Sequence, residues 1–130
     1  MAVIASHIAA RNSELEAIEA AAKDYLYGYL TGDPDRHLNA YHPEAIKRRY
    51  TQDEDGVFGM INLSPRTMAD SAATVEPEDD CEVEIFIDDV SQDIASVRVY
   101  SCHWIDFLHI VKARGQWKLL HVTWHRRSTE

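Results

Sequence analysis

The stretch WIDFLHIVKARGQWKLLHVTWH, residues 104–125, decides the fold class. It holds two segments rich in β-branched, aromatic and leucine side chains, residues 104–112 and 116–125, with a short break between them. The break contains Gly115, which can adopt a positive φ and suits a tight connection. Two such segments around a tight turn predict an antiparallel hairpin of long strands.

Four more strands are predicted upstream of this hairpin. Residues 81–90 alternate apolar and polar side chains, and an apolar segment at residues 94–102 follows them after a polar turn. Residues 45–51 and 57–62 flank another polar turn, at residues 52–56. These patterns extend the hairpin to a larger sheet.

Three helices are predicted ahead of the long strands. The first runs from Ser13 to Leu30, and Ser13 with Glu16 fits a capping box, in which each side chain satisfies a free backbone N–H. The second begins at Pro34 and the third at Pro65, because proline is tolerated in the first helical turn. Since helices come first and long strands last, the sequence predicts an α+β fold with helices packed on an antiparallel sheet.

The composition restricts the possible partners. The chain has 130 residues, the size of one domain, and a formal net charge of −9, which argues against nucleic acid and anionic membrane surfaces as partners. No segment has the pattern of a signal peptide or a membrane-spanning helix, so a cytoplasmic location is expected. Cys81 and Cys102 lack a zinc-binding spacing and are interpreted as two thiols in a reducing compartment.

Several short motifs, taken in order, resemble the nuclear-transport-factor-2-like superfamily. Residues 25–28 (YLYG), 31–33 (TGD) and 42–45 (HPEA) look like its beginning, and residues 106–108 (DFL) and 115–119 (GQWKL) look like its closing strands. More narrowly, the chain is similar to the branch named putative lumazine-binding or SnoaL-like.

This resemblance implies a cone-shaped roll, in which a strongly bent antiparallel sheet wraps around the N-terminal helices and leaves a pocket. It implies one domain over residues 13–126, preceded by an extension over residues 1–12. Relatives include isomerases, dehydratases and cyclases, as well as proteins without activity, and many are homodimers through the outer sheet face. No cofactor is expected.

The register of the terminal hairpin predicts which side chains share a face. If Ala113 pairs with Gln116, Asp106 lies opposite Thr123. Because side chains alternate along a strand, one face then carries Trp104, Asp106, Leu108, His121, Thr123 and His125. A carboxylate, imidazoles and a hydroxyl among apolar groups are typical of a ligand pocket, so Trp104, Leu108 and Thr123 are predicted to contact a ligand.

The opposite face of the same hairpin is predicted to be an interface. It would carry the apolar side chains Ile105, Phe107, Leu120, Val122 and Trp124. An apolar face of this extent is rarely left in water, which predicts a homodimer through the outer side of the sheet.

Asp106 is the candidate general base. A carboxylate among apolar walls has a raised pKa, and His121 or His125 could hold or pass its proton. Tyr25 and Tyr29, on the apolar stripe of the first helix, could present hydroxyls to the same pocket. The alternative is that Asp106 and His125 form a buried hydrogen-bonded pair that only fixes the strands.

Two other groups of polar residues are interpreted as non-functional. His121 and His125 are four residues apart on a strand, about 13 Å by the strand rise, so no metal site is expected. Lys47, Arg48 and Arg49 alternate across a predicted strand and are interpreted as a solvated surface.

Three functions stay open. The favoured one is a pocket that binds a small hydrophobic or planar molecule. The second is a cofactor-independent isomerase, dehydratase or cyclase that uses Asp106 as general base. The third is a structural or interaction domain whose cavity is filled by its own side chains.

Overall fold

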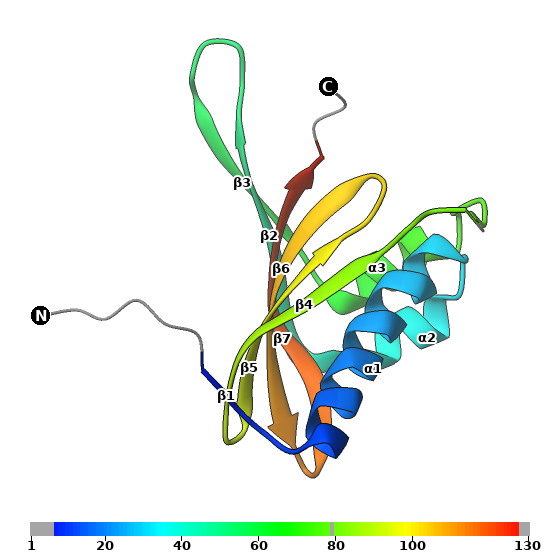
Figure 1. Ribbon diagram of the computed structural model, residues 1–130. Helices are drawn as coiled ribbons and strands as arrows, with labels where there is room; N and C mark the ends of the chain where they lie inside the picture. The colour runs from blue at the N-terminus through cyan, green and yellow to red at the C-terminus, as the bar shows by residue number, and fades with distance from the viewer. Residues whose placement is uncertain (1–6, 79, 128–130) are drawn as a thin grey trace, which may run out of the picture.

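The computed structural model describes residues 7–78 and 80–127 of the protein (Figure 1). These residues form three helices and seven strands. In chain order they are β1 (Ile8–Ala9), α1 (Asn12–Leu30), α2 (Pro34–Asn39), β2 (Tyr41–Gln52), β3 (Phe58–Leu63), α3 (Pro65–Ala72), β4 (Glu84–Ser91), β5 (Ile94–Tyr100), β6 (Trp104–Ala113) and β7 (Gln116–Arg126).

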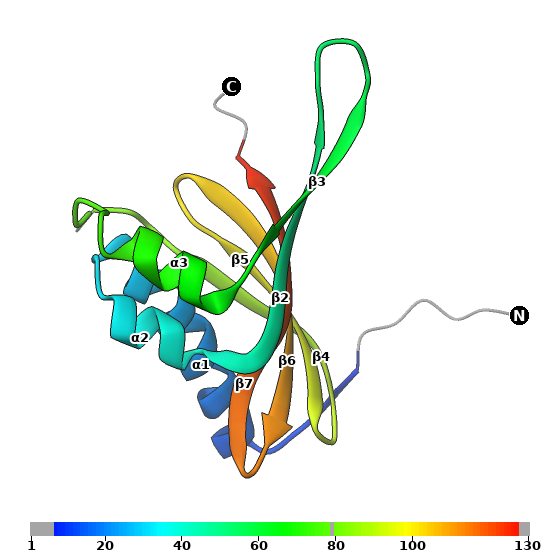
Figure 2. The ribbon, with the colours of Figure 1, turned by 180° about the vertical axis from the view of Figure 1, so that it is seen from behind.

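The strands form one sheet, in the order β1-β4-β5-β6-β7-β2-β3. Neighbours are antiparallel except for two parallel pairs, β1 with β4 and β2 with β7. All three helices lie on one side of the sheet in both views (Figures 1 and 2). The predicted α+β class, with helices packed on a bent sheet, is confirmed. The two parallel pairs make the sheet mixed.

The helices begin close to the predicted positions, with one correction at the first. α1 starts at Asn12, and its cap residue Arg11 makes no side-chain cap hydrogen bond, so the capping box predicted at Ser13 is wrong. At α3, in contrast, the Ser64 side chain accepts a hydrogen bond from the Thr67 backbone N–H, and Pro65 follows it. None of the helices among the described residues is long and apolar enough to cross a membrane.

The core lies between α1 and the concave face of the sheet. Ile18, Ala22 and Leu26 recur every four residues on α1 and are at most 3% exposed. They pack against inward-facing side chains of the sheet such as Val99 and Leu119, which are fully buried. Burial of each large aliphatic side chain contributes about 1.5–3 kcal/mol.

A glycine lets α1 and α2 approach closely. A Cβ atom built on Gly28 would lie 2.5 Å from the backbone nitrogen of His37, a distance that side chains do not tolerate. Helix propensity alone disfavours glycine in a helix interior by about 1 kcal/mol relative to alanine. The contact overrides that preference, and it brings the His37 side chain against the C-terminal half of α1.

The hairpin of β6 and β7 contains a β-bulge at Leu120. Up to Leu119 the predicted register is confirmed, with Ala113 paired with Gln116. Beyond it, His109 pairs with His121, so Leu120 is an extra residue without a partner.

The bulge reverses the side-chain directions predicted for the end of β7. Asp106 lies opposite Trp124 instead of Thr123, and Leu108 lies opposite Val122 instead of His121. The predicted shared face is therefore wrong for the β7 residues, because a one-residue insertion moves every later side chain to the other face.

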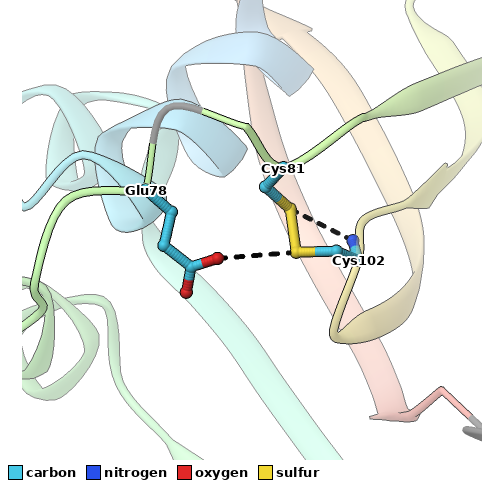
Figure 3. Close-up of side chains that lie close together, drawn as sticks. All are labelled: Glu78, Cys81 and Cys102. Atoms are coloured by element: carbon cyan, nitrogen blue, oxygen red, sulfur yellow. Dashed lines mark hydrogen bonds between the residues drawn. A yellow bond between two sulfur atoms is a disulfide. The ribbon is translucent and has the colours of Figure 1, made fainter.

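Two further features lie at the two ends of β4. Ile8 and Ala9, within the expected N-terminal extension, pair with β4 at the edge of the sheet. Cys81 and Cys102 are joined by a disulfide between the segment before β4 and the β5–β6 turn (Figure 3). Their interpretation as free thiols is therefore wrong. A disulfide that closes a loop of this size stabilises a fold by about 3 kcal/mol.

Candidate functional site

A cavity of about 280 Å³ lies between α1, α3 and the inner face of the sheet. Its walls are mainly apolar and aromatic, and three of its polar side chains are bonded to one another. The lining residues are Tyr25, Leu26, Tyr29, His37, Lys47, Leu63, Thr67, Met68, Ser71, Trp104, Asp106 and Trp124. Apolar walls with a few convergent polar groups are the usual composition of a small-molecule site.

The three bonded polar side chains are Lys47, Tyr25 and Asp106, which we call the triad. The Tyr25 hydroxyl donates a short hydrogen bond to Oδ2 of Asp106 and accepts one from Nζ of Lys47, at 2.7 Å. The exposed fractions of the three residues are 2% for Tyr25, 6% for Lys47 and 4% for Asp106. Each charge is therefore removed from water and depends on the other members for compensation.

Each member of the triad comes from a different element. Tyr25 lies on the buried stripe of α1, and Asp106 lies on the inward-facing side of β6. Lys47 faces inward because β2 pairs in parallel with β7, where Lys47 is the partner of the buried Val122. The interpretation of Lys47 as part of a solvated strand is wrong, whereas its neighbour Arg48 is exposed.

Burial dominates the electrostatics of the triad. It raises the pKa of Asp106, although the charge of Lys47 and the hydrogen bond from Tyr25 act in the opposite direction. Burial also lowers the pKa of Lys47 to about 8, against the attraction of Asp106. For Tyr25, burial and the nearby Asp106 charge raise the pKa well above its ordinary value. Protons thus bind Asp106 more tightly, and Lys47 more weakly, than they bind the same groups in water.

Two further hydrogen bonds link Tyr41 and His37 to the backbone of Tyr25. The Tyr41 hydroxyl donates to Nε2 of His37 at 3.1 Å, and Nδ1–H of His37 donates to the Tyr25 carbonyl at 2.6 Å. This arrangement requires neutral histidine, and burial lowers the pKa of His37 to about 4. His37 therefore fixes α1 next to the triad at neutral pH.

Aromatic side chains form much of the remaining cavity lining. Trp104 packs edge-on against Tyr29, whose hydroxyl lies 2.9 Å from the Ser71 hydroxyl. Trp124 lies beside Lys47, with Nζ 5.1 Å from its ring centroid. Among the described side chains, the Trp124 indole nitrogen is buried without a hydrogen-bond partner.

The predicted site residues divide into two groups. Asp106, Tyr25, Tyr29 and Trp104 line the cavity, and Leu108 is buried in the core without lining it.

The structure does not bring His121, Thr123 and His125 to the cavity. They are exposed on the other face of the sheet, beyond the bulge. There Nδ1 of His121 lies 3.3 Å from Nδ1 of His109. Lys47, His37 and Trp124 were missed as site residues. Their inward direction depends on strand pairing and helix packing, and a local pattern does not report either.

Metal-ligand geometry occurs once among the described residues. Donor atoms of Glu78, Cys81 and Cys102 all lie within 4.8 Å of one another (Figure 3). The two sulfur atoms are bonded to each other, so neither is a thiolate that could bind a metal ion. Glu78 instead accepts a hydrogen bond from Nε2 of His103 at 2.8 Å.

Comparison with protein families identifies the family to which the chain belongs. The family described as putative lumazine-binding matches residues 13–125, which is most of the sequence, and the protein belongs to this family. No curated protein matches the chain.

Solved structures share the fold. A nuclear-transport-factor-2-like protein of unknown function from Shewanella baltica OS155 has a TM-score of 0.79 at 20% identity, over 93% of this chain and 99% of that one. A ketosteroid isomerase-like protein from Erwinia carotovora atroseptica SCRI1043 has a TM-score of 0.65 at 20% identity, over 91% and 99%.

A third solved structure, a putative scytalone dehydratase from Novosphingobium aromaticivorans DSM 12444, has a TM-score of 0.66 at 19% identity, over 89% of this chain and 85% of that one. At such identities the likeness establishes the nuclear-transport-factor-2-like fold, of cystatin-like type, and leaves the chemistry to the site.

Replacement of Lys47 by methionine tests the electrostatics of the triad. Between pH 8 and 10.5 the unfolded chain holds the Lys47 proton more tightly than the folded chain. The free energy of unfolding therefore rises with pH in this window. We expect the wild type to gain about 3 kcal/mol relative to Lys47→Met from pH 8 to 10.5, by urea denaturation.

Lys23→Met, at an exposed position of α1, is the matched control and should keep the pH dependence of the wild type. A constant difference between wild type and Lys47→Met across this window would show that the pKa of Lys47 is not lowered in the folded protein.

Proposed function

We propose that the protein binds a small, mainly hydrophobic or planar molecule in the cavity, with a polar group of that molecule toward the triad. The observation that carries the proposal is an apolar cavity at whose end buried polar groups converge. Apolar residues can often replace a buried ion pair without loss of stability. Packing alone therefore does not require Lys47 and Asp106 at these positions. The cavity volume favours a small ligand.

The unpaired indole N–H of Trp124 supports a ligand that carries an oxygen atom. A buried donor without a partner costs about 1–3 kcal/mol. A carbonyl or hydroxyl oxygen that reached this N–H would recover that energy. The aromatic rings of Trp104 and Tyr29 would stack against the planar part of the same molecule.

Obstruction of the cavity mouth tests binding. Thr67 lines the cavity from the exposed side of α3, so Thr67→Trp should fill its entrance. In a thermal-shift screen of planar aromatic alcohols and carbonyl compounds, ligands should raise the melting temperature of the wild type and not of Thr67→Trp.

Arg66→Trp is the matched control, because Arg66 precedes Thr67 on α3 and does not line the cavity. It should respond to ligands as the wild type does. Equal shifts in wild type and Thr67→Trp would mean that the ligands bind elsewhere.

The second candidate function is proton transfer with Asp106 as general base. One observation favours it: Asp106 lines the cavity and its carboxyl has a raised pKa, as a base that works near neutral pH requires. Tyr25 would hold the carboxyl in position. We expect the protein to catalyse exchange of an acidic C–H proton of a bound ketone for deuterium from the solvent. NMR measures the rate of this exchange.

Asp106→Asn should reduce this exchange by at least about a hundredfold, the usual contribution of a general base, while ligand binding persists. Exchange at the wild-type rate in Asp106→Asn would exclude Asp106 as the base.

We also propose that the protein is a homodimer through the outer face of the sheet. Val122 and Trp124 face inward, so the interface is smaller than the sequence predicted. Its centre is Phe107, 51% exposed, which pairs across the sheet with Arg98 and Thr123. Arg98 in turn covers the ring of Phe86 at 4.7 Å.

Sedimentation at micromolar concentration should give twice the chain mass of 14.8 kDa for the wild type. Phe107→Lys should be monomeric, because a buried ammonium group beside Arg98, its cross-strand neighbour of the same charge, opposes association. Phe58→Lys, in the exposed β2–β3 hairpin, is the control and should stay dimeric. A monomeric wild type would contradict the proposal.

A further inference from the structure

Lys47 differs from every other lysine of the chain in its surroundings. Lys23, Lys112 and Lys118 lie at the surface or half-buried and bond to Glu19, Glu14 and Asn39. Lys47 is buried, and it is one of the residues that line the cavity. Among the described residues, its only hydrogen-bond partner is the Tyr25 hydroxyl. Since an ammonium group has three N–H donors, Nζ has capacity for a ligand.

The surroundings of Nζ favour the neutral amine, which is the nucleophilic form. With a pKa of about 8, about a tenth of the Lys47 side chains are neutral at pH 7. A desolvated lysine in an apolar pocket is the usual form of an amine that adds to carbonyl groups. The rings of Tyr25 and Trp124, each with its centroid 5.1 Å from Nζ, supply the apolar surroundings.

We propose that Lys47 forms an imine with an aldehyde or ketone bound in the cavity. This inference rests on the proposed function, because it requires the cavity to hold a ligand. It narrows the ligand class to carbonyl compounds and assigns Nζ of Lys47 as the reacting atom.

The step balances without an oxidant, a reductant or a cofactor. The neutral Nζ uses its lone pair to form a bond to the carbonyl carbon, and the C=O π electrons move to oxygen. One proton moves from Nζ to this oxygen, which gives a carbinolamine. The hydroxyl takes up a second proton and leaves as water when the C–O bond breaks, while the nitrogen lone pair forms the C=N double bond. Nζ then loses its remaining proton, which replaces the one given to the hydroxyl.

Tyr25 and Asp106 are placed to move these protons. The Tyr25 hydroxyl contacts both Nζ of Lys47 and Oδ2 of Asp106, so a proton leaving Nζ can pass through the hydroxyl to the carboxyl. Because the pKa of Asp106 is raised, the carboxyl can hold that proton and return it to the departing oxygen. The triad thus combines the nucleophile with its acid–base partner.

Reductive trapping tests the inference. The wild-type protein is incubated at pH 7 with 2-naphthaldehyde and sodium cyanoborohydride, which reduces an imine to a stable secondary amine. Peptide mapping by mass spectrometry should then find the adduct on Lys47 at a level at least about tenfold above that on each other lysine. Equal labelling of all four lysines, or no label on Lys47, would overturn the inference.

Two controls separate the cavity reaction from general amine reactivity. Lys47→Arg keeps the charge and should lose this adduct, while Lys23→Arg should keep it. If Lys47→Arg does not fold, the wild type alone decides: 2-naphthylmethanol, which has the same ring system and no carbonyl, should suppress the Lys47 adduct. An adduct that the alcohol does not suppress would contradict a reaction in the cavity.

The alcohol also distinguishes failure of imine formation from failure of ligand binding in the cavity. If 2-naphthylmethanol raises the melting temperature of the wild type and no Lys47 adduct forms, the cavity binds ligands and the imine is excluded. If the alcohol does not bind and no adduct forms, both proposals fail.

Discussion

Lys47 and Asp106 carry opposite charges inside the protein, and the Tyr25 hydroxyl stands between them. Transfer of such groups from water costs several kcal/mol for each ion, and their attraction offsets this cost only with suitable geometry. The arrangement therefore requires α1, β2 and β6 to be held in fixed relative positions. Removal of one partner from a buried pair costs about 3–5 kcal/mol. The triad therefore affects the stability of the fold in addition to the binding of a ligand.

The rest of the structure meets this constraint by close packing around α1. Gly28 allows α2 to approach, and His37 on α2 then donates to the carbonyl of Tyr25. The parallel pairing of β2 with β7 turns Lys47 toward the helix. The bulge at Leu120 turns Trp124 inward, where its ring covers the amine of Lys47. Packing of this kind leaves a cavity beside the triad that apolar and aromatic residues enclose.

Local sequence patterns predicted most of the fold and only part of the candidate site. Alternating and helical spacings located all the long strands and the helices, because those signals arise within a few neighbouring residues. Asp106 and Tyr25 were predicted at the pocket for the same reason. His121 and His125 were placed at the pocket too, because the extra residue Leu120 follows a second leucine, and the sequence pattern does not show that either of them is unpaired. Lys47 was missed because its direction depends on the partner strand β7, which is distant in sequence.

The central claim is that the amine of Lys47 is desolvated beside Asp106 and the cavity. The most direct measurement is an NMR titration of the ¹⁵N-labelled side-chain nitrogen of Lys47, assigned by its loss in Lys47→Arg. The account predicts a pKa of about 8 for this amine, and a shift of the resonance when a carbonyl ligand is added. A pKa at the ordinary lysine value of 10.5 would contradict this claim, because burial would then not outweigh the attraction of Asp106.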